Sequence, residues 1–294
     1  MRLFRRSLDL SLATPREGTL EDLSAVSRLI RNSAHRFTSF PNPNLPALLT
    51  GAPSMLLTAG QEIWAAAIAG WPTGATTWLR TLAIADGLMI GPTLDLLLPP
   101  FHDLLRAHRI SHLFYAGDES ADIWIQPALS LRGYTRETDV VVYEKPTLDM
   151  PSRGNQAVRV RQAEAVDLPM ILEIDRACFA PQWNKDETVI GPALFEVPYF
   201  VVVELAGEMI GYSFATTHFD GRLVHLVRIA VLPIYQGQGI GVRLLAEVIE
   251  FAQTCGADVL TLNTQAHNSV AQRLYEWFGF HRTGEKQTVL RYDL

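Results

Sequence analysis

Residues 231–241, with the sequence VLPIYQGQGIG, decide the fold of the C-terminal half of this 294-residue chain. An apolar run ends at Pro233, and three glycines then fall within five residues, at Gly237, Gly239 and Gly241. Glycine lets the backbone approach an anion closely, and the free N–H groups and dipole at a helix start favour negative charge. The stretch therefore predicts a strand, a phosphate-binding loop and a helix.

Three other interpretations of this loop fit less well. An ordinary strand-to-helix turn seldom needs three glycines. A dinucleotide-binding loop requires a third glycine where this chain has Val242, and an acidic residue after the next strand, whereas Asp258 precedes it. A P-loop requires Gly-Lys-Ser/Thr, which is absent. The pattern that fits is Q-x-x-G-x-G, formed by Gln236, Gly239 and Gly241.

The sequence around the loop predicts an α+β fold, because a meander of strands gives way to alternating strands and helices. Amphipathic spacing predicts helices over residues 167–177, 239–254 and 269–278. Apolar runs bounded by turn residues predict strands over 199–205, 209–216, 223–231 and 259–263, and near 288–292.

A faint internal repeat divides the chain into two halves. The corners LRGYTR, at residues 131–136, and WFGFHR, at 277–282, place Gly133 and Gly279 146 residues apart. The same offset places Glu62 on Glu208. We therefore expect two copies of one fold, over residues 1–145 and 158–294, joined by a linker over 146–157 that is rich in turn residues.

The segment from Val158 to Leu294 resembles the GCN5-related N-acetyltransferases (GNAT). The resemblance rests on the Q-x-x-G-x-G loop after a Val-x-Pro strand end and on Asn268, Tyr275 and the Phe-Gly-Phe corner that follow it. Within the family it is most similar to the ribosomal-protein alanine N-acetyltransferases, which share Cys178-Phe179. The resemblance implies tandem GNAT-like folds, each a mixed, mostly antiparallel sheet flanked by helices, as in mycothiol synthase.

The resemblance also implies a reaction: direct transfer of acetyl from acetyl-CoA, a co-substrate, to a primary amine in a ternary complex. The acceptor would be a small molecule or a peptide N-terminus. The residues it implies for binding acetyl-CoA are Ile229, Ala230, Val231, Gln236, Gly237, Gln238, Gly239, Ile240, Gly241, Val242 and Asn268.

Tyr275 matches the family's general acid, since a phenol stays protonated at neutral pH and can donate to a departing thiolate. Its alternative is a core tyrosine, and the alternative for Asn268 is a helix N-cap. The alanine acetyltransferases carry a glutamate base where this chain has Asn263. The base is therefore open: a water held by Asn263 is one candidate and His225 is another.

The first half lacks these groups. At the offset of 146, Gln236, Gly239 and Gly241 fall on Ile90, Thr93 and Asp95, and Tyr275 falls on Leu129. We therefore expect a degenerate copy, which either walls the acceptor groove or only stabilises the protein.

Composition bounds the other possibilities. The net charge of −6 argues against a nucleic-acid binder, which needs clustered basic residues, and no apolar run reaches the length of a membrane span. Two cysteines offer neither a disulfide framework nor metal-ligand spacing. Residues 1–12 are expected to form a solvated arm rather than a signal peptide, so a cytoplasmic protein is expected. The rival function is a non-catalytic acyl-CoA-binding or interaction protein, which has no use for Tyr275 as an acid.

Overall fold

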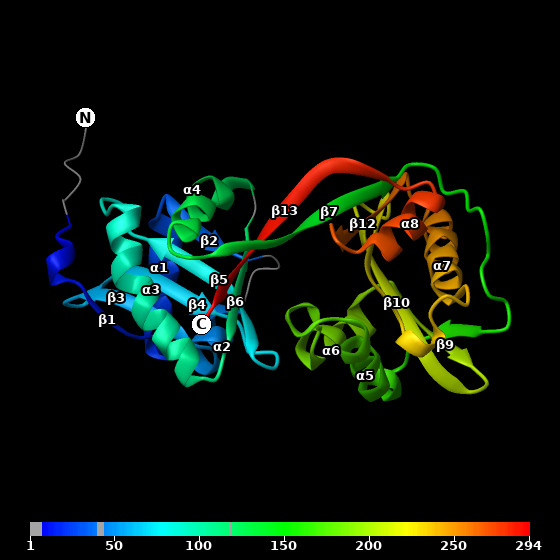
Figure 1. The fold of residues 1–294 in the computed structure, drawn as a ribbon, viewed down its shortest axis with the longest axis horizontal. Helices are drawn as coiled ribbons and strands as arrows, with labels where there is room; N and C mark the ends of the chain where they lie inside the picture. Colours follow the sequence, from blue (N-terminus) through cyan, green and yellow to red (C-terminus); the bar gives the residue numbers. More distant parts are fainter. Residues whose placement is uncertain (1–7, 40–43, 118) are drawn as a thin grey trace. The chain divides into compact units, whose positions relative to one another are not determined.

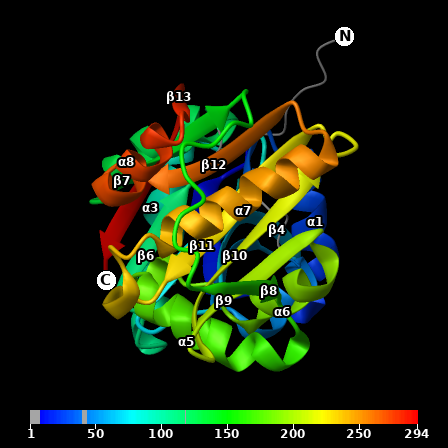
Figure 2. The same cartoon turned by 90° about the vertical axis from the view of Figure 1, so that its right-hand side faces the viewer.

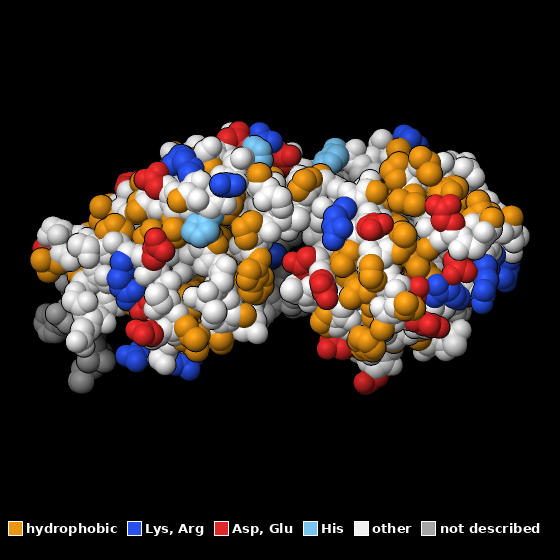
Figure 3. Space-filling view, turned by 90° about the horizontal axis from the view of Figure 1, so that it is seen from below, with side chains coloured by type: hydrophobic (Ala, Val, Ile, Leu, Met, Phe, Trp, Pro, Cys, Tyr) orange, Lys and Arg blue, Asp and Glu red, His pale blue; other side chains and the backbone are white. Residues whose placement is uncertain are grey.

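The computed structural model describes residues 8–39, 44–117 and 119–294. The chain forms two compact units. Unit 1 contains Met1–Thr138 together with Gln287–Leu294, and unit 2 contains Asp139–Lys286. In the view of Figure 3, acidic and basic side chains are intermingled over the described surface of both units.

Unit 1 is a sheet flanked by helices (Figure 1). Its strand order is β1-β3-β4-β5-β6-β13, and a short strand, β2, pairs with β5. The strands are β1 (Thr14–Glu17), β2 (His35–Thr38), β3 (Ser54–Ala59), β4 (Glu62–Ala69), β5 (Thr76–Ile84), β6 (His112–Ala116) and the end of β13 (His281–Asp293). The helices are α1 (Leu23–Asn32), α2 (Leu45–Gly51), α3 (Ile90–Ala107) and α4 (Glu119–Ser130).

Unit 2 repeats this plan, with the strand order β7-β12-β11-β10-β9-β8. The strands are β7 (Thr135–Lys145), β8 (Arg159–Gln162), β9 (Tyr199–Leu205), β10 (Glu208–His218), β11 (Leu223–Val231) and β12 (Val259–Gln265). The helices are α5 (Leu168–Cys178), α6 (Glu187–Glu196), α7 (Ile240–Cys255) and α8 (Ser269–Trp277).

Alternation along the strands of unit 2 builds one apolar core on each face of its sheet. Val201 and Val203 of β9 belong to the cluster that contains the α7 stripe, whereas Val202 belongs to the cluster under α5 and α6. Figure 2 shows α7 lying across the sheet. Gly256 follows the last residue of this helix and caps it, with a left-handed φ of +68° that suits a glycine.

The predicted tandem α+β architecture is confirmed. The offset of 146 places the start of β4, Glu62, on the start of β10, Glu208, and the start of β7, Thr135, on the start of β13, His281. The predicted helices and strands of the C-terminal half appear within a few residues of their expected ends, except that β13 is longer. One helix was missed: α6 contains Gly191 and Pro192, which disfavour a helix in a sequence-based prediction.

The compact units do not coincide with the boundaries expected from the repeat. Residues 140–145 of β7 pair with β12 inside unit 2, and residues 289–293 of β13 pair with β6 inside unit 1. Residues 146–157 form no helix or strand and belong to unit 2. A sequence repeat locates the two copies, but a terminal strand can complete either sheet, so the offset does not decide where the units divide.

The N-terminal segment forms little regular structure where it is described. Of the predicted N-terminal arm, residues 1–7 lie outside the described residues, and Leu10–Leu12 form a single 3-10 turn. None of the helices among the described residues is long and apolar enough to span a membrane.

Candidate active site

The candidate site of unit 2 lies where two strands part. β11 pairs in parallel with β12 only over Leu223–Leu226. The pairing of β10 with β11 skips Val227, which forms a β-bulge, and bulges bend the strand that carries them. β12 meanwhile continues along β7. A cavity of about 720 Å³ lies beyond the parting, lined by β11, β12, the glycine loop and α8.

The open edge of β11 carries backbone groups that can pair with an extended ligand. The N–H of Leu232 donates to the Ile210 carbonyl at 2.9 Å, toward β10. Because successive strand residues direct their backbone groups to opposite edges, Ala230 also faces β10, whereas Ile229 and Val231 face the cavity. Of the three residues expected to bind the cofactor here, Ala230 therefore directs its backbone groups toward β10, although it is among the residues that line the cavity.

One backbone acceptor on this edge is already used. The Val231 carbonyl accepts a hydrogen bond from Gln236 Nε2 at 2.9 Å and another from Cys178 Sγ at 3.2 Å. Gln236 of the Q-x-x-G-x-G pattern thus ties the loop back to the strand that precedes it. The backbone N–H and carbonyl of Ile229 and the backbone N–H of Val231 remain directed at the cavity.

The glycine loop has the geometry of an anion cradle. Gly237 and Gly239 both have a φ of +76°, a left-handed conformation that favours glycine. Gly239 is the residue before α7, and the first turn of that helix carries no acidic side chain. Gly237, Gly239, Gly241 and Val242 line the cavity. Two predicted residues, Gln238 and Ile240, are not among the residues that line the cavity; the Gln238 side chain is exposed and the Ile240 side chain is buried.

Tyr275 lies in α8 and lines the same cavity. Its ring packs near those of Tyr143 and Phe280, with centroids 6.1 and 5.9 Å away. Burial raises the pKa of Tyr275 to about 12, so the phenol is a proton donor at every ordinary pH. Asn268 lines the cavity and also caps α8, its Oδ1 accepting the Ala271 N–H at 3.2 Å. Asn268 can therefore cap α8 and still make the predicted contact with acetyl-CoA.

The structure does not bring His225 to the cavity. Its Nδ1 lies 2.9 Å from Thr261 Oγ1, in the closed part of the β11–β12 pair. Burial lowers the pKa of His225 to about 4. Asn263 does line the cavity and is exposed. Among the described residues that line the cavity there is no carboxylate.

An ion pair that sequence reasoning missed lies beside the cavity. Asp175 of α5 is fully buried, and Arg228 of β11 donates to both of its carboxylate oxygens at 2.8 Å. Arg228 also donates to the Trp183 carbonyl at 2.7 Å and lies 3.4 Å above the ring of Phe179. The sequence feature that could have predicted this pair is an acidic residue on an apolar helix face together with a basic residue within an apolar strand. Buried charges require partners, so such residues are expected to pair.

Comparisons with known proteins agree with this geometry. A model of the acetyltransferase (GNAT) family matches residues 168–280. The ribosomal protein bS18-alanine N-acetyltransferase of Haemophilus influenzae is 30% identical over 129 residues, which are 42% of this chain and 80% of the relative. The chain belongs to the GNAT family.

Solved structures of GNAT proteins show the same tandem fold. A GNAT protein from Kribbella flavida superimposes with a TM-score of 0.71 at 16% identity, over 98% of this chain and 73% of that chain. A tandem GNAT protein from the clavulanic acid biosynthesis pathway has a TM-score of 0.60 at 12% identity, over 96% of this chain and 98% of that chain. At these identities the likeness concerns the fold alone.

Proposed function

We propose that unit 2 transfers the acetyl group of acetyl-CoA to a primary amine. The observation that carries this proposal is the open edge of β11, which leads directly to a left-handed glycine loop and faces Tyr275 across one cavity. An extended pantetheine arm and a pyrophosphate fit an open strand edge and a helix start, respectively. Bound there, acetyl-CoA supplies an activated thioester.

Each part of the chain has a defined task in this proposal. The backbone N–H groups from Gly237 to Val242 hold the pyrophosphate. Ile229 and Val231 pair with the pantetheine arm, and a backbone N–H on this edge stabilises the oxyanion as the amine nitrogen attacks the thioester carbon. When the carbon–sulfur bond breaks, Tyr275 donates its proton to the sulfur and is reprotonated from solvent.

The proton on the attacking nitrogen leaves by a different path. Since the described cavity lining contains no carboxylate, we propose that the amine enters in its neutral form and loses its second proton to a water held by Asn263. His225 is not needed for this step, because it does not line the cavity. The relative in Haemophilus influenzae is named for a protein N-terminal alanine, and the acceptor proposed for this chain is a small amine or a peptide N-terminus.

The test is a screen of acceptors with the full chain and acetyl-CoA. Peptides with free N-termini, their N-acetylated counterparts and small primary amines are compared, and release of the CoA thiol is followed with a thiol reagent. We expect thiol release that depends on a free amine and yields an N-acetylated product by mass spectrometry. Tight binding of acetyl-CoA without amine-dependent release over a broad panel would instead favour the non-catalytic acyl-CoA-binding protein.

A further inference from the structure

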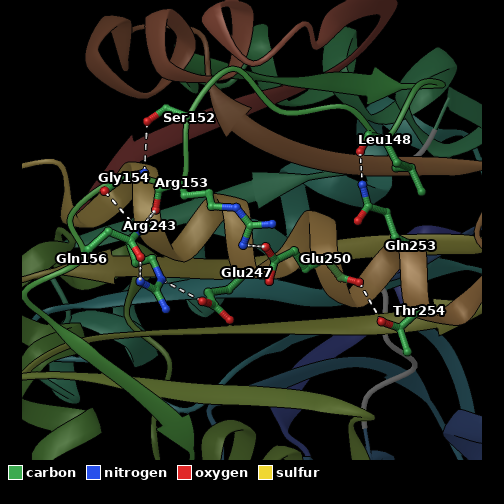
Figure 4. A network of polar contacts seen from close by, with 10 residues as sticks. All are labelled: Leu148, Ser152, Arg153, Gly154, Gln156, Arg243, Glu247, Glu250, Gln253 and Thr254. Atoms are coloured by element: carbon green, nitrogen blue, oxygen red, sulfur yellow. Dashed lines mark hydrogen bonds and ion pairs between the residues drawn. The ribbon is translucent and has the colours of Figure 1, made fainter.

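We call residues 146–157 the connector. The connector runs along α7 from the C-terminal end of the helix to its start and contacts it on the way (Figure 4). Near the C-terminus of α7, Gln253 Nε2 donates to the Leu148 carbonyl at 2.5 Å. Farther along, Arg153 pairs with Glu250. The connector is therefore an ordered element of unit 2, although its composition is that of a flexible linker.

The connector reaches the glycine loop at Asn155. The Asn155 side-chain amide donates to the Gln238 carbonyl at 2.9 Å, and its backbone N–H donates to the Gly239 carbonyl at 3.1 Å. The Asn155 Oδ1 accepts the N–H of Ala157 at 2.8 Å. Because both ends of the amide have partners, the side chain is held in one orientation.

The approach of the two backbones is close enough to require glycine at residue 154. Gly154 has a φ of +66°, and a Cβ there would lie 2.3 Å from the Arg243 nitrogen and 2.8 Å from the Gly239 carbonyl oxygen. Any side chain at this position would push the connector off the start of α7. The contact between Asn155 and the loop is thus built into the backbone path.

A peptide plane links this contact to the cavity. In a trans peptide the carbonyl of one residue and the N–H of the next point in opposite directions. Asn155, which is not among the residues that line the cavity, binds the Gln238 carbonyl, so the N–H of Gly239, which does line the cavity, points away from Asn155. Gly239, with its left-handed φ, has no side chain to fix this plane by itself.

We propose that Asn155 is a positioning residue for the phosphate-binding loop. It orients the Gln238–Gly239 peptide so that its N–H faces the pyrophosphate of acetyl-CoA, without touching the ligand. This inference rests on the proposed function, and it assigns part of the cofactor affinity to a residue outside the GNAT motif.

The test compares three variants of the full chain: Asn155→Ala, Asn155→Asp and Arg153→Ala. Asn155→Asp keeps the acceptor for Ala157 but replaces the donor to Gln238 with an oxygen. Arg153→Ala removes a contact of the same connector that does not reach the loop. Calorimetric titration with CoA measures affinity, steady-state kinetics separates the KM for acetyl-CoA from kcat, and thermal unfolding measures stability.

We expect both Asn155 variants to raise the Kd for CoA and the KM for acetyl-CoA by about three- to tenfold, which corresponds to one net hydrogen bond. The KM for the amine and kcat should stay within about twofold, and Arg153→Ala should leave the affinity unchanged. Unchanged affinity in both Asn155 variants, or an equal loss in Arg153→Ala, would overturn the inference. Failure of the parent protein to bind CoA would instead overturn the proposed function, and this inference with it.

Discussion

In unit 2 the edge of β11 from Val227 to Val231 lines a cavity, whereas in unit 1 the corresponding edge of β5 is occupied by the chain itself. β5 parts from β6 after Trp78, as β11 parts from β12. Residues 81–84 of β5, which correspond to 227–230, then pair with β2. The two copies thus keep the same opening of the sheet, but in unit 1 a strand fills the place where an extended ligand would add.

The segment that fills the edge in unit 1 is held differently in unit 2. By the offset of 146, β2 corresponds to residues 181–184, of which Pro181–Trp183 form a 3-10 turn instead of a strand. There the Arg228 side chain binds the Trp183 carbonyl and pairs with Asp175. Unit 1 has Leu82 at the position of Arg228, and it has Ile30 at the position of Asp175 when the starts of α1 and α5, Leu23 and Leu168, are aligned. The comparison teaches that side-chain anchoring of this segment leaves the backbone edge open for a ligand.

The largest expected effect is the loss of cofactor binding in Gly239→Asp. The substitution adds a negative charge where the phosphates must approach the start of α7. The matched control is Gly91→Asp, which places the same charge near the start of α3, at the position of unit 1 that corresponds to Gly237. Calorimetry on the full chain should give one acetyl-CoA site in the parent and in Gly91→Asp, and none in Gly239→Asp. Two sites in the parent would break the comparison.

Tyr275→Phe should lower turnover by roughly 10²–10⁴, the usual effect of a positioned general acid, while acetyl-CoA affinity barely changes. The control is Tyr143→Phe, because Tyr143 is a neighbouring buried tyrosine whose hydroxyl donates to Glu276 at 3.0 Å and does not line the cavity. That variant should lose stability and keep its turnover. If the turnover of Tyr275→Phe stayed within a few-fold of the parent value, Tyr275 would not be the general acid and would serve only in packing.

Arg228→Leu introduces the unit 1 residue into unit 2 and leaves the buried Asp175 carboxylate without its charge partner. Unfolding by denaturant should show unit 2 destabilised by about 3–5 kcal/mol. The double variant Asp175→Leu/Arg228→Leu should recover much of this free energy. Arg222→Ala, which breaks an exposed pair with Asp258, should cost about 1 kcal/mol or less. Equal effects for the buried and exposed pairs would contradict the anchoring role.

The smallest expected effect is that of His225→Gln on the pH dependence of kcat/KM. Burial raises the pKa of Tyr275 to about 12 and lowers the pKa of His225 to about 4. The phenol therefore stays protonated until the pH approaches 12, and the imidazole stays neutral above its own pKa, so neither group titrates between about pH 5 and 9. The rise of kcat/KM with pH should follow the acceptor, near about 8 for a peptide α-amine and about 10 for a lysine side chain.

The measurement is a pair of pH profiles for two amines of different pKa, repeated with His225→Gln. The rise should move with the amine and be the same in the variant. A rise at one pH for both acceptors that disappears in His225→Gln would identify His225 as the base.

The sequence by itself determined the features that depend on neighbouring residues. Three closely spaced glycines after a strand predicted the anion loop, because a left-handed backbone at Gly237 and Gly239 is a local requirement. The repeat predicted the tandem fold, since each copy carries its own pattern of apolar residues. The position of Tyr275 beside the cavity agrees with its place in the motif, although its role remains a prediction.

Only the tertiary structure decided which edges are open and which charges are paired. The pairing of β2 with β5, the contact of Asn155 with the loop and the ion pair of Asp175 with Arg228 each join residues more than forty positions apart. No local pattern specifies such partners, because a strand edge or a buried charge is satisfied by whatever the fold brings to it. The sequence thus determined the chemistry available to each half, and packing decided in which half this strand edge is open.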